Sequence, residues 1–112
     1  MDRSLADHWI KASDHNCFKY AKMMAKKEGI MSGGSAGANL YAAVRYAKEN
    51  NLGKNDKVVV IVCDCIRHYT DNFFSKNWMA EKHLNPYESL HEDSHHLSDI
   101  KIKEITGFLF VI

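Results

Sequence analysis

Proline is almost absent from this sequence of 112 residues, which holds one, Pro86. The longest apolar run, Val58 to Cys63, has the length of a strand and is far shorter than the ~18 residues of a membrane span. The start, Met1 to Ser4, lacks the apolar stretch of a signal peptide. Neither sign of charge dominates, because 15 Lys and Arg residues balance 14 Asp and Glu residues. These features give no support for a nucleic-acid or membrane partner.

Cysteine is scarce and odd in number, with three residues at Cys17, Cys63 and Cys65. An odd count argues against a disulfide framework and indicates a reducing, cytoplasmic setting. Cys63 and Cys65 would point to the same side of a strand end, but no second Cys/His pair completes a zinc site. The histidines His91, His95 and His96 lie in an acidic, polar stretch and are interpreted as solvated. We therefore expect no metal site.

Hydrophobic residues make up 46% of the chain, enough for one small domain with a core. The first predicted helix is Asp14 to Glu28, with Ser13 or Asp14 as its cap and Gly29 as its stop. Its predicted apolar face holds Phe18, Ala21, Ala25 and, beside them, Met24. Its predicted solvated face holds Lys19, Lys22, Lys26 and Lys27.

Three further elements follow. A second helix is predicted over Ala36 to Asn50, with Gly53 beyond its end, because apolar residues recur at helical spacing. Lys57 to Cys63 is a β-branched run, typical of a strand that is buried on both faces in a parallel sheet. Asp71 to Lys82 is a candidate third helix. The order helix-loop-helix-strand-helix predicts an α/β fold.

Chemical interest centres on the segment Ser32 to Gly37, at the start of the second predicted helix. Three interpretations stay open: a Ser N-cap with a glycine turn, a phosphate cradle, and a contact of the Ser35 hydroxyl with a cofactor ring. The cradle is the weakest, since no Lys follows Gly37 as the phosphate-loop pattern requires. Asp64 follows the predicted strand, at the edge where α/β sheets place ligands, although loop capping is its commoner role. Arg67 and His68 could bind anions or face solvent.

An ordered set of motifs resembles the last third of the cystathionine β-synthase catalytic domain, roughly over residues 2 to 84. The motifs are Asp2-Arg3, Asp7-His8-Trp9, Ser13-Asp14 with Phe18, Glu28 to Gly37, Asp64-x-x-Arg67-x-Tyr69 and Phe74-x-x-x-Trp78-Met79. The broader group is the pyridoxal phosphate β-family, which also includes the cysteine synthases.

The resemblance implies a fragment of a type II pyridoxal phosphate-dependent fold, like that of tryptophan synthase β. It also implies a lyase that condenses serine with homocysteine to cystathionine by β-replacement, in transsulfuration and cysteine biosynthesis. Ser35 matches the residue whose hydroxyl contacts the pyridine nitrogen of the cofactor. Gly33, Gly34 and Gly37 would shape the loop beside the ring. The full-length family forms homo-oligomers.

Other parts of the family pattern are missing or altered. The Schiff-base lysine, the phosphate loop and the haem-binding segment of animal members all belong to upstream sequence, so we assign no catalytic residue here and expect this chain alone to be inactive. The family's Pro-Asp-Ser is Cys63-Asp64-Cys65. Residues 1–84 are predicted as the end of the catalytic domain. Residues 85–112 are predicted as a linker or tail, either the entrance to a regulatory module or a product of an incorrect gene model. The alternatives are a cysteine synthase-type enzyme and a non-catalytic module that binds the full-length subunit.

Overall fold

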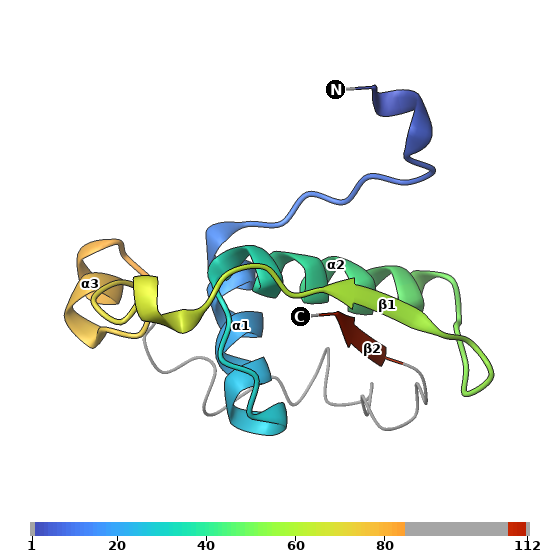
Figure 1. The fold of residues 1–112 in the computed structure, drawn as a ribbon. Helices are drawn as coiled ribbons and strands as arrows, with labels where there is room; N and C mark the ends of the chain where they lie inside the picture. The colour runs from blue at the N-terminus through green and yellow to red at the C-terminus, as the bar shows by residue number, and fades with distance from the viewer. Residues whose placement is uncertain (1, 85–107, 112) are drawn as a thin grey trace.

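The computed structural model describes residues 2–84 and 108–111, so the predicted boundary at Pro86 and the histidines at 91, 95 and 96 lie outside the described residues. Within these described ranges three helices and two strands carry the fold, with one short 3₁₀ turn before α1 and another after β1 (Figure 1). They are η1 (Arg3–Leu5), α1 (Asp14–Glu28), α2 (Gly34–Glu49), β1 (Val58–Ile61), η2 (Ile66–His68), α3 (Lys76–Glu81) and β2 (Phe108–Val111). The predicted α/β order of helix, loop, helix, strand and helix is confirmed. No helix in the described ranges has the length and apolarity that crossing a membrane requires.

Helix α1 has the predicted bounds because both of its ends are set by local capping. The Ser13 hydroxyl accepts a hydrogen bond from the Asn16 N–H at 3.3 Å. Gly29 closes the helix in the left-handed region, with φ 70°, and its N–H donates to the Ala25 carbonyl. The prediction of a solvated lysine face is wrong at Lys19, which is only 8% exposed. The side chain of Lys22 is half-buried, and this burial lowers its pKa. Long aliphatic stems let lysines pack against neighbouring elements, and the helical pattern alone does not reveal this.

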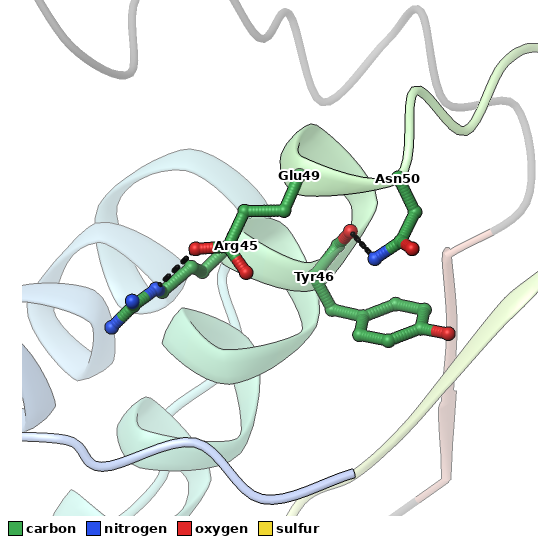
Figure 2. Close-up of polar contacts among 4 residues, drawn as sticks. All are labelled: Arg45, Tyr46, Glu49 and Asn50. Carbon is green, nitrogen blue, oxygen red and sulfur yellow. Dashed lines mark hydrogen bonds and ion pairs between the residues drawn. The ribbon is translucent and has the colours of Figure 1, made fainter. Parts of the chain in front are cut away.

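Helix α2 begins two residues before its predicted start. Gly33 is its N-cap and supplies no side chain, so the interpretation of a Ser N-cap is wrong. The helix ends at Glu49, one residue before its predicted end, because Asn50 closes it. Both the backbone N–H and the side-chain amide of Asn50 donate to the Tyr46 carbonyl, at 3.0 and 2.9 Å (Figure 2). Figure 2 also shows the exposed ion pair between Arg45 and Glu49 at this end.

The main core lies between α1, α2 and β1, where α2 runs beside the strand (Figure 1). Its buried residues are Tyr20, Met24, Ala36, Leu40, Val44, Val60 and Val62. The two helices pack closely at Gly37, where a Cβ would overlap the Cys17 carbonyl oxygen and lie 2.7 Å from the Ala21 nitrogen. Glycine is therefore needed at position 37 for this helix–helix contact.

Strand β1 pairs with β2 in parallel, with Val58 opposite Phe108 and Ile61 opposite Val111. Burial along β1 alternates, since Val60 is 2% exposed whereas Val59 and Ile61 are 58% and 62% exposed. The prediction of a strand buried on both faces is therefore wrong for the described part of the chain. Helix α2 packs on one face, and the described residues leave the other face open.

Helix α3 is shorter than the predicted Asp71 to Lys82, because Ser75 caps its start by accepting from the Trp78 N–H at 3.4 Å. The residues before Ser75 form turns. A second core nevertheless forms here, from buried Ala21, Phe73 and Met79. Phe18, Tyr69, Phe74, Trp78 and Leu84 pack around these three residues. This cluster fixes the segment after β1 against helix α1.

Candidate functional site

Ser35, the predicted cofactor contact, lies in the first turn of α2 with its side chain exposed. The first hydrogen bond that closes this turn runs from the Gly37 N–H to the Gly33 carbonyl, at 3.3 Å. The backbone N–H groups that precede Gly37 are not used by the helix, and the helix dipole is positive at this end. The Ser35 hydroxyl is therefore a polar group that a ligand can reach, in an electropositive environment.

The glycines around Ser35 are packed against protein. A Cβ on Gly33 would lie 2.7 Å from Tyr69 Cε2 and 3.0 Å from Asp64 Cβ, and one on Gly34 would lie 3.1 Å from Phe18 Cε1. Gly37 lies against helix α1 in the same way. Each of the three predicted loop glycines therefore leaves space for a neighbouring segment of the chain. In this structure the glycines set the position of the α2 start relative to α1 and to the turn after β1.

The turn after β1 lies against the start of α2. Asp64, predicted at the carboxyl end of the strand, has a left-handed backbone with φ 59°. Its carboxylate accepts a hydrogen bond from the Tyr69 hydroxyl at 2.8 Å. This bond to Asp64 raises the pKa of Tyr69. Asp64 thus contacts a side chain of its own loop.

Two more contacts hold the end of β1 to the start of α2. Ser32, which is fully buried, forms an isolated antiparallel bridge with Cys65. From the second turn of α2, the Asn39 amide donates to the Ile61 carbonyl at 2.8 Å. The sequence analysis did not identify Asn39 as a candidate, and it named Tyr69 within a motif without giving it a role. Their spacing in the chain gives no indication of these partners, which depend on how the elements pack.

Of the remaining candidates, Cys63 and Cys65 lie within this arrangement, since the Asn39 amide also donates to the Cys63 sulfur at 3.7 Å and Cys65 is the bridge partner of Ser32. Arg67 and His68 are exposed on η2. Cys63 is half-buried and Cys65 is exposed, and both are free thiols. Within the two described ranges, no group of three or more His, Cys, Asp or Glu side chains is placed to hold a metal ion.

A family model described as pyridoxal-phosphate dependent enzyme matches residues 1–64. The chain belongs to this family. The resemblance seen in the sequence motifs is thus confirmed, and most of the matched part is the segment that builds α1, the glycine loop and α2.

Curated relatives agree with the family assignment. The cystathionine beta-synthase of Oryctolagus cuniculus is 38% identical over 90 residues, 80% of this chain and 16% of the relative. That of Saccharomyces cerevisiae is 36% identical over 85 residues, 75% of this chain and 17% of the relative. A cysteine synthase of Buchnera aphidicola subsp. Schizaphis graminum is 36% identical over 81 residues, 72% of this chain and 25% of the relative. The chain thus spans between 16% and 25% of the length of these relatives.

The described residues fit pyridoxal phosphate at one point. The cofactor has a pyridine nitrogen that accepts a hydrogen bond from a neutral hydroxyl, and Ser35 presents such a hydroxyl, exposed, at the start of α2. The space beside Gly33 and Gly37 is filled by Tyr69, Asp64 and helix α1, so these glycines leave no room there for the ring. Ser35 is therefore the residue of this chain that would hold the ring.

Proposed function

We propose that this chain forms one wall of the cofactor site in a cystathionine β-synthase-like enzyme of the type II fold. That enzyme would join serine to homocysteine by β-replacement and make cystathionine. The proposal rests mainly on the exposed Ser35 hydroxyl in the first turn of α2, within a chain that belongs to the pyridoxal-phosphate dependent family. The covalent anchor of the cofactor and its phosphate loop would come from sequence outside this chain.

The residue type at position 35 suits the proposed reaction. When bound, pyridoxal phosphate supplies an electron-withdrawing ring next to the reacting amino acid. An aspartate beside the ring nitrogen would hold that nitrogen protonated, whereas a serine hydroxyl only donates a hydrogen bond to it. The weaker pull suits loss of a leaving group, which needs no long-lived carbanion. Ser35 would thus orient the ring and limit how strongly it withdraws electrons.

The test is Ser35→Ala in the longer enzyme that carries this chain. Alanine is a good helix former, so we expect the fold to persist. We expect the rate of β-replacement to fall about tenfold or more, because a hydrogen bond to the ring is lost. The absorption of the covalently bound cofactor should remain, although its band should shift. The measurements are cystathionine formation and the visible spectrum.

The matched control is Ser4→Ala, which removes another exposed hydroxyl, on η1, where Ser4 bonds locally to Asp2. We expect this variant to keep both the rate and the spectrum. Unchanged turnover and an unchanged band in Ser35→Ala would contradict the proposed role.

A cysteine synthase-type enzyme is the second candidate, and the identity to the Buchnera relative favours it. It shares the proposed role of Ser35 and differs in its substrates. The two candidates are separated by supplying the longer enzyme either with serine and homocysteine or with O-acetylserine and sulfide. Faster turnover of serine with homocysteine supports a cystathionine β-synthase. Faster turnover of O-acetylserine with sulfide supports a cysteine synthase.

A further inference from the structure

Asp64 and Tyr69 form a pair directly against Gly33, the N-cap of α2. The Tyr69 hydroxyl donates to the Asp64 carboxylate at 2.8 Å. The Tyr69 ring covers Gly33 so closely that a Cβ there would lie 2.7 Å from Cε2 and 3.1 Å from Cζ. The Asp64 Cβ would lie 3.0 Å from the same position. Both members of the pair therefore contact the N-cap of α2.

The pair is itself held from several sides. The Tyr69 N–H donates to the Ile66 carbonyl at 2.8 Å, and the Tyr69 ring packs on Phe73, which is fully buried, with 5.4 Å between ring centroids. Asp64 has a left-handed backbone that few residues other than glycine adopt, although aspartate is among the more tolerant. Surrounding contacts must maintain that conformation, and the bond from Tyr69 is one of them.

The start of α2 has little of its own to fix it. Its N-cap, Gly33, has no side chain to bond the free N–H groups of the first turn. Glycine is also the most flexible residue in the backbone. Just before it, Ser32 is bridged to Cys65, and beyond it Asn39 is bonded to Ile61. Between these two ties, Gly34 packs on Phe18 and Gly37 on α1, while the nearest atoms to a Cβ on Gly33 itself belong to Tyr69 and Asp64.

We propose that Asp64 and Tyr69 are positioning residues that clamp the backbone at Gly33 and so fix the place of the Ser35 hydroxyl. This inference rests on the proposed cofactor contact of Ser35. Ser35 lies two residues after Gly33, so movement of the N-cap moves the hydroxyl. A hydrogen bond weakens steeply when its angle falls below about 120°, and small shifts of a positioning group cost large factors in rate.

The first experiment measures the clamp without the cofactor. It uses amide hydrogen exchange in the longer enzyme that carries this chain, after the cofactor has been removed. Tyr69→Phe keeps the ring over Gly33 and removes the bond to Asp64. We expect the Gly37 amide, which bonds to the Gly33 carbonyl, to exchange about fivefold faster in this variant.

Tyr46→Phe is the matched control, since it removes a tyrosine hydroxyl near the other end of the same helix (Figure 2). We expect it to leave Gly37 exchange unchanged. Asp64→Asn keeps an oxygen acceptor and tolerates the left-handed backbone, so we expect a smaller effect than that of Tyr69→Phe. Equal exchange of Gly37 in the parent and in Tyr69→Phe would overturn the clamp.

The second experiment asks whether the clamp acts through Ser35. It compares the absorption band of bound pyridoxal phosphate in Ser35→Ala, in Tyr69→Phe and in the double variant. We expect both single variants to shift the band in the same direction and the double variant to shift it no further than Ser35→Ala. A purely structural role of Tyr69 would lower stability without this shared signature.

The outcomes separate the two proposals. A shift with Ser35→Ala but none with Tyr69→Phe overturns the positioning role and leaves the function intact. No shift with Ser35→Ala overturns the proposed contact of Ser35, and the positioning role with it, whatever Gly37 exchange shows. Independent, additive shifts in the double variant also count against the clamp. If Tyr69→Phe does not fold, Asp64→Asn and the double variant Asp64→Asn/Ser35→Ala take its place in both comparisons.

Discussion

At the scale of single residues, Tyr20 is in a costly environment. Its side chain is 1% exposed, within the core between α1 and α2, and its ring contacts that of Tyr41. Its hydroxyl is buried and has no hydrogen-bond partner in the part of the chain that the structure describes. Burial strongly raises the pKa of this hydroxyl. Leaving a buried donor without a partner costs free energy of folding.

Replacement of Tyr20 by phenylalanine is therefore expected to stabilise the protein by about 1 kcal/mol, because the ring is kept and the buried hydroxyl is removed. The pH dependence should change as well. The folded pKa lies above the unfolded one, so the parent loses stability as the pH rises above about 10, where the unfolded tyrosine ionises. The Phe variant should lack that part of the loss.

Urea unfolding at neutral pH and above pH 10 measures both effects. The exposed Tyr46→Phe is the control and should change the neutral-pH value little. A Tyr20→Phe protein that is less stable than the parent at neutral pH would show that the hydroxyl has a partner after all.

At the scale of elements, the packing of α1 on α2 depends on Gly37. The space that a Cβ would need at Gly37 is occupied by two backbone atoms of α1, the Cys17 carbonyl oxygen and the Ala21 nitrogen. Backbone atoms cannot rotate away as a flexible side chain can. One added methyl group at this position must therefore push the two helices apart.

We expect Gly37→Ala to lower the free energy of unfolding by about 1 to 3 kcal/mol, the usual cost of overpacking a core. Gly53→Ala is the matched control, because a Cβ there would meet nothing within 4 Å. It should be neutral or slightly stabilising, since alanine reduces the freedom of the unfolded chain. Denaturant midpoints of the two variants provide the comparison, and equal midpoints would contradict the close helix contact.

Local capping allowed the ends of α1 to be predicted correctly, whereas the start of α3 was missed although Ser75 caps it locally. Ser13 and Gly29 cap α1 locally, so both of its ends were found. The start of α2 was placed too late, because a glycine pair reads as a loop until Tyr69 and Phe18 are known to pack on it. The burial of Lys19 and the open face of β1 likewise depend on which segments cover them. For the site, the position of Ser35 near a helix start was predicted, whereas the Asp64–Tyr69 contact needed the fold.

At the scale of the whole molecule, the outer face of β1 exposes large apolar side chains. Val59 and Ile61 are more than half exposed on this face. The chain spans only 16% of the length of a relative such as the Oryctolagus cuniculus enzyme. Exposed apolar strand faces are usually covered by further structure. Under the proposed type II fold, the remaining part of the longer enzyme would cover this face.

The double variant Val59→Thr/Ile61→Thr tests this arrangement. Threonine keeps the preference for a strand but is less apolar. We expect the longer enzyme to lose about 1 to 2 kcal/mol of stability per substitution, because apolar area is buried there. In the 112-residue chain the same change should leave stability nearly unaltered and reduce self-association. Thermal unfolding of the enzyme and sedimentation of the chain measure the two effects.

The control is Val60→Thr, on the face that packs against α2, which should destabilise both proteins. If the double variant is as stable as the parent in the longer enzyme, the outer face of β1 is open there too.

The bridge between Ser32 and Cys65 has a consequence for protein engineering. It means that the glycine–serine loop would not keep its conformation if its sequence alone were transferred to another helix. The conformation of the loop depends on contacts with a strand end and a tyrosine that lie about thirty residues later in the chain. The smallest unit that could be transplanted with the hydroxyl of Ser35 correctly aimed therefore runs from Ser13 to Phe73.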